Sequence, residues 1–266
     1  MSTKDSLGDR MKLYESAFNH TYPIRMPLII RFDGVHFHSN VKRWKCKKPF
    51  DDNLIDAMQF TAKALCEAIS GAQIAYVQSD EITILIRDDM SNKSQPWYNK
   101  EINKILSVGA AKATNAFNFR YQQLNGSFTQ MSQMAEFDAR GMVFPEHEIF
   151  SEFHWRQTDA SRNSIQMLGH ANFSQKELHK KSCDEIQEML FQQHDINWNN
   201  IQTHYKRGAC VIKVESPIEV PKRNELGKII EDETEIIMRS KWVIDNEIPI
   251  FTQDRDYINK FAKLAT

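Results

Sequence analysis

The sequence lacks any apolar stretch that approaches the length needed to cross a bilayer, about 20 residues in a helix. Residues 1–10 are polar and have no apolar core of a secretory signal. The four cysteines are widely scattered and form no CxxC pair, which argues against a zinc ribbon or a redox motif. We therefore expect a cytoplasmic protein with reduced thiols and no membrane partner, an organelle being the alternative location.

A strong charge imbalance is also absent, because the formal net charge is −1. The distribution of charge is more informative than its sum. A run of basic residues interrupted by Trp44 comprises Lys42, Arg43, Lys45, Lys47 and Lys48. Such a run can meet phosphates and a base, although an isolated one is more often a solvated loop. With 266 residues, 41% of them hydrophobic, the chain can bury a sizeable core.

The first half alternates between strand and helix patterns, with no convincing internal repeat. We expect strands at 27–32, 72–78, 81–86 and 135–144, and helices at 51–69 and 100–124. The order strand, helix, strand, strand, helix, strand is that of the ferredoxin-like split βαβ motif. The sequence therefore predicts an α+β protein with the helices of this motif on one face of the sheet.

The pattern changes after Pro145. We expect helices at 150–168 and 175–193, a strand at 208–214, and an irregular segment with short strands from residue 215 to a last helix near 254–264. This predicts a palm-like catalytic domain at 1–145 and a C-terminal α+β extension at 146–266, with a single shared core as the alternative.

Two aspartates should meet in this topology, because the first strand ends at the same sheet edge as the turn between the second and third strands. Asp33 ends the first strand and Asp80 lies in that turn. Mg²⁺ prefers such oxygen ligands, and two ions can hold both oxygens of an in-line displacement. Gly34 permits close approach, so its carbonyl is a further candidate ligand. Taken singly, Asp-Gly and Ser-Asp are common turn residues.

The residues after Asp-Gly are candidates for nucleotide binding. Phe37 could stack on a base, and His36 or His38 could contact phosphate. The alternatives are a loop histidine without a role and an aromatic side chain anchored in the core. Lys48, Lys100 and Lys104 are candidate phosphate ligands, the last two four residues apart as on one helix face, with a solvated lysine face as the alternative.

A polar segment after Trp155 is the candidate contact with RNA. Arg156 could pair with Asp159 as a brace within a helix, whereas Arg162 and Asn163 could position RNA. The basic pair Lys206-Arg207 has the same ambiguity between an RNA contact and a solvated position.

Several dispersed segments, in the same order along the chain, resemble the tRNA-His guanylyltransferase family, and most closely its like-protein branch. They are IIRFDGVHFH at 29–38, KPFD at 48–51, AYVQSDE at 75–81 and WRQTDASRNS at 155–164. The resemblance extends from about residue 14 to residue 214.

The resemblance implies a palm that binds two Mg²⁺ ions and a nucleotide. It implies metal binding by Asp33, the Gly34 carbonyl and Asp80, with Glu81 in a supporting catalytic role. Other matching positions imply nucleotide or phosphate contacts, namely Val35, His36, Phe37, His38, Lys48, Ser79, Lys100 and Lys104. Arg156, Arg162, Asn163, Lys206 and Arg207 are expected to contact tRNA.

The implied activity is templated 3′–5′ addition of nucleotides to the 5′ end of tRNA, after ATP or GTP activates the 5′-phosphate. The resemblance also implies a homo-oligomer, commonly a tetramer. Members dedicated to tRNA-His carry His-Ile-Asn-Asn where this chain has Ser161 to Ser164, which favours repair of 5′-truncated tRNAs. The alternatives are addition of a single guanylate to tRNA-His, a nucleotidyl cyclase with the same palm, and an RNA-binding module without catalysis.

Overall fold

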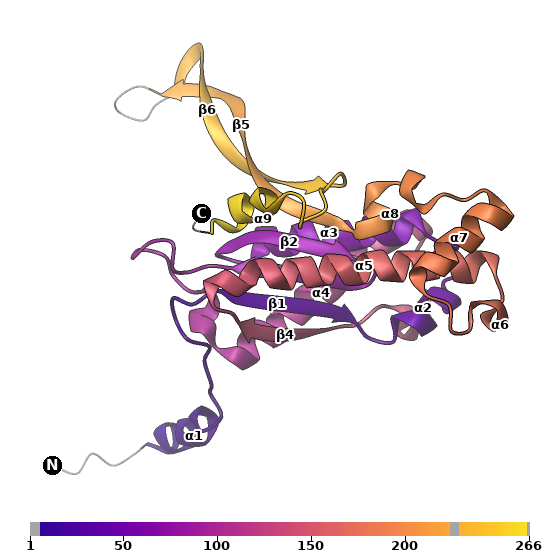
Figure 1. Ribbon diagram of the computed structural model, residues 1–266. Coiled ribbons are helices and arrows are strands. Elements are labelled where there is room, and N and C mark those ends of the chain that lie inside the picture. Colours follow the sequence, from indigo (N-terminus) through magenta and orange to yellow (C-terminus); the bar gives the residue numbers. More distant parts are fainter. Residues whose placement is uncertain (1–5, 224–228, 265–266) are drawn as a thin grey trace.

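The computed structural model describes residues 6–223 and 229–264 and is built on a six-stranded sheet (Figure 1). The strands are β1 (Leu28–Gly34), β2 (Ala72–Gln78), β3 (Glu81–Ile86), β4 (Phe137–Val143), β5 (Ala209–Arg223) and β6 (Ile229–Asp245). Their order in the sheet is β4-β1-β3-β2-β5-β6, and all neighbours run antiparallel. The first four strands have the predicted ferredoxin-like arrangement.

The described helices are α1 (Leu7–Ser16), α2 (Phe37–Arg43), α3 (Asp52–Ala68), α4 (Ile102–Asn125), α5 (Ile149–Asn172), α6 (Gln175–Leu178), α7 (Cys183–His194), α8 (Thr203–Arg207) and α9 (Arg255–Ala262). Short 3₁₀ turns lie at Trp97–Lys100, Met131–Gln133, Glu146–Glu148 and Trp198–Asn200. No helix in the described part of the chain is long and apolar enough to span a membrane. The four cysteines are free thiols.

The sheet buries both faces, because successive side chains of a strand point to opposite sides. Leu28, Ile30 and Phe32 of β1 pack with α3 and α4 in one core. Ile29 of β1 joins a second core with α5 and α9. The helices of the βαββαβ motif thus share one face, as predicted. Elements from both sides of residue 145 contribute to the same sheet, while the division into domains at that residue stays a prediction.

The prediction of an irregular segment after residue 215 is wrong, because this part of the chain forms the long hairpin β5–β6 (Figure 1). The prolines Pro217 and Pro221 motivated the expectation. Only Ala209 to Ile212 of β5 pair with β2, so beyond Ile212 no described strand lies along one edge of β5. A proline is tolerated where its missing N–H would face such a free edge.

The prediction of a single helix at 175–193 is also wrong, because a second capping box, at Ser182, divides this stretch into two helices. The Ser174 hydroxyl accepts the Glu177 N–H at the start of α6, and the Ser182 hydroxyl accepts the Glu185 N–H at the start of α7. The pattern Ser-x-x-Glu is a start signal for a helix, so the break was readable from the sequence.

Candidate active site

The site forms where the end of β1 meets the turn between β2 and β3. Asp33 lies directly opposite Glu81 of β3 and Asp138 of β4. The Gly34 N–H donates to the Asp80 carbonyl at 3.0 Å, which ties the strand end to the turn. The two aspartates, distant in sequence, therefore meet at one edge of the sheet, as the topology requires.

The electrostatics of this edge favour a bound cation. Burial raises the pKa of Asp80, and the negative charge of Asp33 raises it further. The hydrogen bond from the Ser79 hydroxyl lowers this pKa and so opposes part of the shift. Within the described residues no three His, Cys, Asp or Glu side chains gather as a closed metal cage. Two carboxylates and a backbone carbonyl, completed by substrate phosphates, are instead the ligand set that suits Mg²⁺.

Glu81 lies beside this pair but is engaged in a buried ion network. Its carboxylate accepts a hydrogen bond from Arg156 Nε at 2.7 Å and lies 3.7 Å from Arg31 Nε. Burial raises the pKa of Glu81, while the charges of Arg156 and Arg31 oppose that shift. Arg31 also pairs with Glu152 on α5. Glu81 therefore anchors β3 to α5 next to Asp33 at this edge.

The RNA contact expected for Arg156 is wrong, and the brace is confirmed. The side chain is only 7% exposed and its guanidinium is committed to Glu81 and, at 3.0 Å, to Asp159. Arg162 bonds the other oxygen of Asp159 at 2.7 Å and stays exposed. Asn163 also contacts Asp159, at 3.4 Å.

The phosphate-binding face expected for Lys100 and Lys104 is wrong. Lys100 precedes α4 in a 3₁₀ turn and is 1% exposed, with its ammonium bonded to the carbonyls of Pro23 and Met26 and to Asp88. These partners precede β1 and follow β3, so they lie at the far end of the sheet from Asp33, about 20 Å away along a strand. Lys104 lies in the first turn of α4, with its ammonium over the ring of Tyr98.

Base stacking by Phe37 is wrong, and the alternative of a core aromatic is confirmed. Its ring is buried against Trp44, Phe117 and Phe137. It lies so close to Gly34 that a Cβ there would come within 2.1 Å of it. The glycine after Asp33 is thus required by its packing against Phe37.

The other predicted nucleotide contacts flank the edge. His36 has a left-handed backbone, with φ of 54°, and begins α2. His36 and His38 are exposed, while Val35 is half-buried and donates its N–H to the Glu136 carbonyl. Ser79 is exposed in the turn with φ of 50°.

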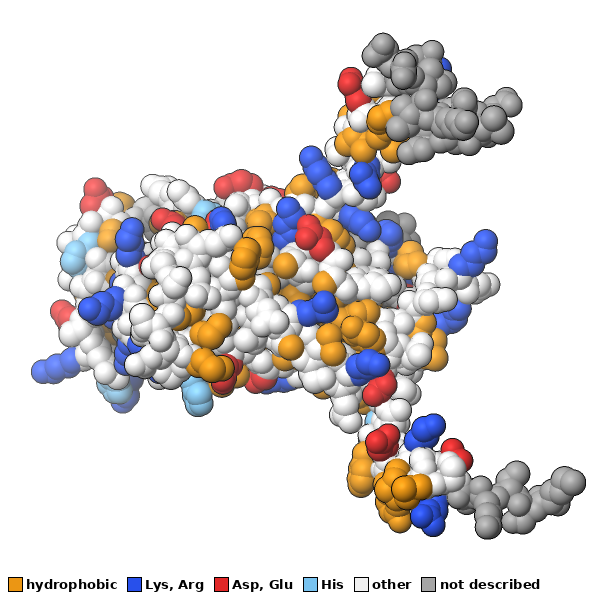
Figure 2. All heavy atoms as spheres, turned by 180° about the vertical axis from the view of Figure 1, so that it is seen from behind, with side chains coloured by type: hydrophobic (Ala, Val, Ile, Leu, Met, Phe, Trp, Pro, Cys, Tyr) orange, Lys and Arg blue, Asp and Glu red, His pale blue; other side chains and the backbone are white. Residues whose placement is uncertain are grey.

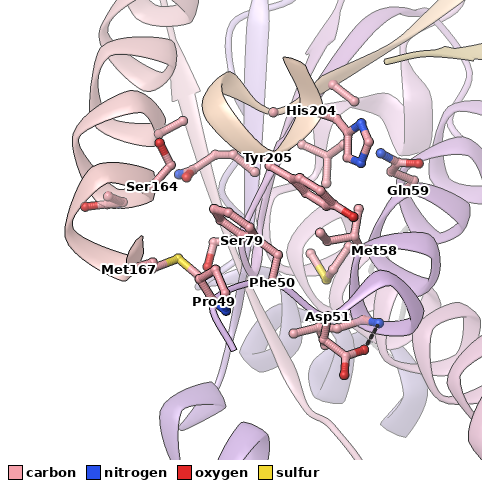
Figure 3. A pocket seen from close by; sticks show the side chains of 18 of the residues that line it. Pro49, Phe50, Asp51, Met58, Gln59, Ser79, Ser164, Met167, His204 and Tyr205 are labelled. Atoms are coloured by element: carbon pink, nitrogen blue, oxygen red, sulfur yellow. Dashed lines mark hydrogen bonds between the residues drawn. The ribbon is translucent and has the colours of Figure 1, made fainter. Parts of the chain in front are cut away.

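A pocket of about 150 Å³ opens beside Ser79, between α3, α5 and α8 (Figure 3). Phe50, Met58 and Met167 give it apolar walls, and the Phe50 ring stacks on Tyr205 at 4.7 Å. Asp51 holds one wall, since its carboxylate accepts the N–H groups of Lys47 and Leu54 and caps α3.

The three basic candidates near the pocket have different surroundings. Lys48 is exposed in the loop that forms a wall. The RNA contact expected for Lys206 is wrong, because its buried ammonium donates to the Asn199 carbonyl at 2.7 Å and lies over the Trp198 ring. Arg207 is half-buried, and its carbonyl accepts the Tyr76 hydroxyl.

Sequence reasoning missed two exposed residues of β4, Asp138 and Arg140. Arg140 lies opposite Arg31 in the sheet, and its guanidinium is 3.4 Å from the Asp33 carboxylate and 3.6 Å from that of Asp138. The predicted pairing of β4 with β1 could have indicated them, since residues directly opposite each other on two paired strands share a face of the sheet.

A ferredoxin-like sheet with two aspartates at the edge where β1 and the β2–β3 turn meet is typical of palm-type nucleotidyltransferases. The family model of tRNAHis guanylyltransferase (Thg1) matches residues 8–145 of this chain. The chain belongs to this family and is a Thg1-like nucleotidyltransferase. Enzymes of the family use metal ions.

Two solved structures resemble the whole chain. A bacterial Thg1-like protein in complex with ATP is 39% identical with a TM-score of 0.80, covering 97% of this chain and 99% of its own. One in complex with GTP is 37% identical with a TM-score of 0.75, covering 98% and 100%. A probable tRNA(His) guanylyltransferase of Dictyostelium discoideum is 25% identical over 231 residues, 81% of this chain and 87% of that protein.

Proposed function

We propose that this protein repairs 5′-truncated tRNAs by templated 3′–5′ addition of nucleotides, with two Mg²⁺ ions at Asp33, Asp80 and the Gly34 carbonyl. The observation that carries the proposal is the meeting of the two aspartates at one sheet edge. When bound, the ions would stabilise the attacking and the leaving oxygen of each displacement at phosphorus.

The reaction has two displacements. An oxygen of the RNA 5′-phosphate attacks the α-phosphorus of ATP or GTP, and pyrophosphate leaves. The 3′-hydroxyl of the next nucleoside triphosphate then attacks the activated 5′-phosphate, and AMP or GMP leaves. Both displacements need the attacking and the leaving oxygen held in line with the phosphorus, which supports a single site for the two steps. The chain's part is to position them, with Arg140 beside Asp33 available to a phosphate.

The charge at the edge supports a requirement for metal. Among the described groups of the edge and its ion network, carboxylates outnumber guanidinium groups. The carboxylates belong to Asp33, Asp80, Glu81, Asp138, Glu152 and Asp159, and the guanidinium groups belong to Arg31, Arg140, Arg156 and Arg162. A triphosphate would meet net negative charge at this edge. Two divalent cations reverse the sign, so metal and triphosphate should bind together.

We assign the pocket beside Ser79 to the base of a bound ATP or GTP. Its walls are largely apolar, and polar side chains such as Gln59, Asn163 and His204 stand among them, a combination that suits a planar ring with hydrogen-bonding edges. It opens next to the turn that carries Asp80, so a nucleotide could place its base in the pocket and its phosphates at the edge. Lys48 and the exposed His36 and His38 remain our candidates for contacts with those phosphates.

The segment Ser161 to Ser164 supports repair over selection of one tRNA. The Ser161 hydroxyl donates to the Gln157 carbonyl, and Arg162 is paired with Asp159. The Ser164 hydroxyl bonds the Lys206 carbonyl and accepts the Trp198 indole N–H. These side chains connect α5 to itself and to the segment of α8, and Asn163 and Ser164 also line the pocket that we assign to the base, so the segment serves the fold and that pocket in this chain.

The experiment is incubation of labelled, 5′-monophosphorylated, truncated tRNAs of several identities with Mg²⁺ and each triphosphate. We expect templated 5′ extension of tRNAs of different identity. Extension of tRNA-His alone, by one guanylate, would establish the dedicated activity instead. An RNA-binding module would give no extension, and Asp80→Asn would leave its RNA binding as in the wild type.

We also propose a homo-oligomer, with a tetramer as the expected state. Helix α1 has no buried residue and stands away from the body, as does the outer part of the β5–β6 hairpin (Figure 1). Both arms carry exposed apolar side chains, visible in Figure 2, including Leu7, Met11 and Tyr14 on α1 and Ile236 and Met238 on β6. An isolated helix of this length is marginal in water, so a second copy is needed to cover it.

A further inference from the structure

Trp155 on α5 is 54% exposed, yet its position is tightly defined. The guanidinium carbon of Arg156 lies 4.4 Å from the centre of its ring system, and that of Arg31 lies 5.2 Å away. Both arginines are themselves largely buried and held by Glu81, Glu152 and Asp159. The indole is therefore supported by a fixed network and still presents much of its surface to solvent.

The indole stands beside the metal-binding edge. Arg31 is two residues before Asp33 on β1, so both point to the same face of the sheet. Arg31 also lies opposite Arg140 of β4, which contacts Asp33. In Figure 1, α5 runs along the front of the sheet and β1 and β4 continue below it. We name the exposed residues of this surface, Asp33, Asp138 and Arg140 with Trp155 at its border, the β1–β4 strip.

The chemistry of the strip selects its occupant. Cores of protein–protein interfaces are depleted in charged residues, whereas this strip is charged except for the indole. An aromatic side chain near a cation that can meet a phosphate, here the exposed Arg140, is an arrangement on which nucleobases stack. Stacking needs only the π-face of a base, so it tolerates any sequence, as repair of different tRNAs requires.

We propose that Trp155 is a stacking platform for the 5′-terminal nucleobase of the RNA, which positions the 5′-phosphate over Asp33 and Asp80. The inference rests on the proposed function and extends it to the placement of the RNA end. Trp155 acts on the reaction as a positioning residue. Its loss should raise the KM for RNA, by roughly 5- to 100-fold for one lost stack, and leave the KM for ATP unchanged.

The test uses a truncated tRNA with 2-aminopurine as its 5′-terminal base, whose fluorescence falls when the base stacks on an indole. The wild-type protein should quench this probe and leave a 2-aminopurine placed inside the acceptor stem unchanged. Trp155→Leu should abolish the quenching and raise the KM for RNA, and Trp155→Phe should fall between the two. Phe191→Leu, at a similarly exposed aromatic on α7, is the matched control and should behave as wild type.

The outcomes separate the two proposals. Absence of 5′ extension by the wild-type protein would refute the proposed function. Extension with no quenching of the terminal probe, or with equal KM for RNA in the wild type and Trp155→Leu, would refute the platform alone. The comparison of the two probe positions uses the wild-type chain, so it decides the matter even where Trp155→Leu does not fold.

Discussion

At the scale of single residues, the site combines two carboxylates that repel each other with side chains that hold them in place. Asp33 and Asp80 come from a strand end and a tight turn, and burial raises the pKa of Asp80. Such a pair costs stability in the metal-free protein and is relieved by a cation. Under the proposed function, the site trades stability for the capacity to bind metal.

The first prediction concerns the stability of the metal-free protein. The folded state favours protonated Asp80, so this group's contribution to stability is present below its unfolded pKa and is lost as pH rises through the raised, folded pKa. At pH 7 Asp80→Asn should raise the thermal midpoint of the metal-free protein by a few degrees. The difference from wild type should shrink as the pH is lowered, which thermal unfolding followed by circular dichroism measures. A lower midpoint for Asp80→Asn at pH 7 would contradict the account.

The second prediction concerns Gly34, where packing leaves no room for a side chain. A Cβ would lie 2.1 Å from the Phe37 ring, so Gly34→Ala must shift the ring or the strand end. We expect a loss of about 1–3 kcal/mol in the free energy of unfolding, measured in urea, together with reduced extension activity. Gly8→Ala on α1, where the nearest atom is 3.7 Å away, is the control and should be neutral or slightly stabilising. Unchanged stability of Gly34→Ala would show that the edge is more adaptable than we infer.

The sequence predicted which residues lie at this edge, but it did not predict which of the other candidate residues are buried and bonded within the protein. The meeting of Asp33 and Asp80 follows from the order of strands, and their role as metal ligands, with the Gly34 carbonyl, stays a prediction. Phe37, Lys100 and Lys206 were misassigned because residue type does not reveal burial. The sequence alone does not distinguish a solvated lysine from one such as Lys100, whose ammonium is buried and bonded to three oxygens.

At the scale of elements, the ion network between the sheet and α5 is the feature that places the site. Glu81 of β3, Arg31 of β1 and Glu152 of α5 are joined through contacts that water barely reaches. The network fixes α5 across the sheet next to Asp33. Removing one partner from a buried pair leaves an uncompensated charge.

The third prediction tests that network. Arg156→Ala leaves Glu81 short of its closest partner, so we expect a loss of about 3–5 kcal/mol in the free energy of unfolding. Arg162→Ala, which removes an exposed partner of Asp159 on the same helix, should cost about 1 kcal/mol or less. Urea titrations of both variants provide the measurement. Equal losses in the two would show that the buried network contributes no more than a surface pair.

The elements themselves were predicted to different degrees. Strands β2 and β3 occur at the predicted residues, because period-two patterns and a tight turn define them locally. The long hairpin β5–β6 was not foreseen, since its prolines are compatible with a strand only where one edge is free, and edges are set by the fold as a whole. The break between α6 and α7 was encoded locally and was overlooked.

At the scale of the whole molecule, a compact body carries two arms with exposed apolar side chains (Figure 1, Figure 2). Helix α1, the first of these arms, has no buried residue. The fourth prediction is that the protein is a tetramer by analytical ultracentrifugation, and that Ile236→Lys shifts it toward smaller species. Lys241→Ala, at an exposed charged position of the same strand, should leave the mass unchanged. A wild-type protein that sediments as a monomer would refute the assembly.

The most direct measurement of the central claim is the binding of Mn²⁺, as a paramagnetic substitute for Mg²⁺, in the presence of ATP and followed by electron paramagnetic resonance. The account predicts two bound ions per protomer in the wild type, loss of binding in Asp33→Asn and Asp80→Asn, and normal binding in Asp184→Asn, a surface control on α7. Wild-type stoichiometry and affinity in both Asp33→Asn and Asp80→Asn would contradict it.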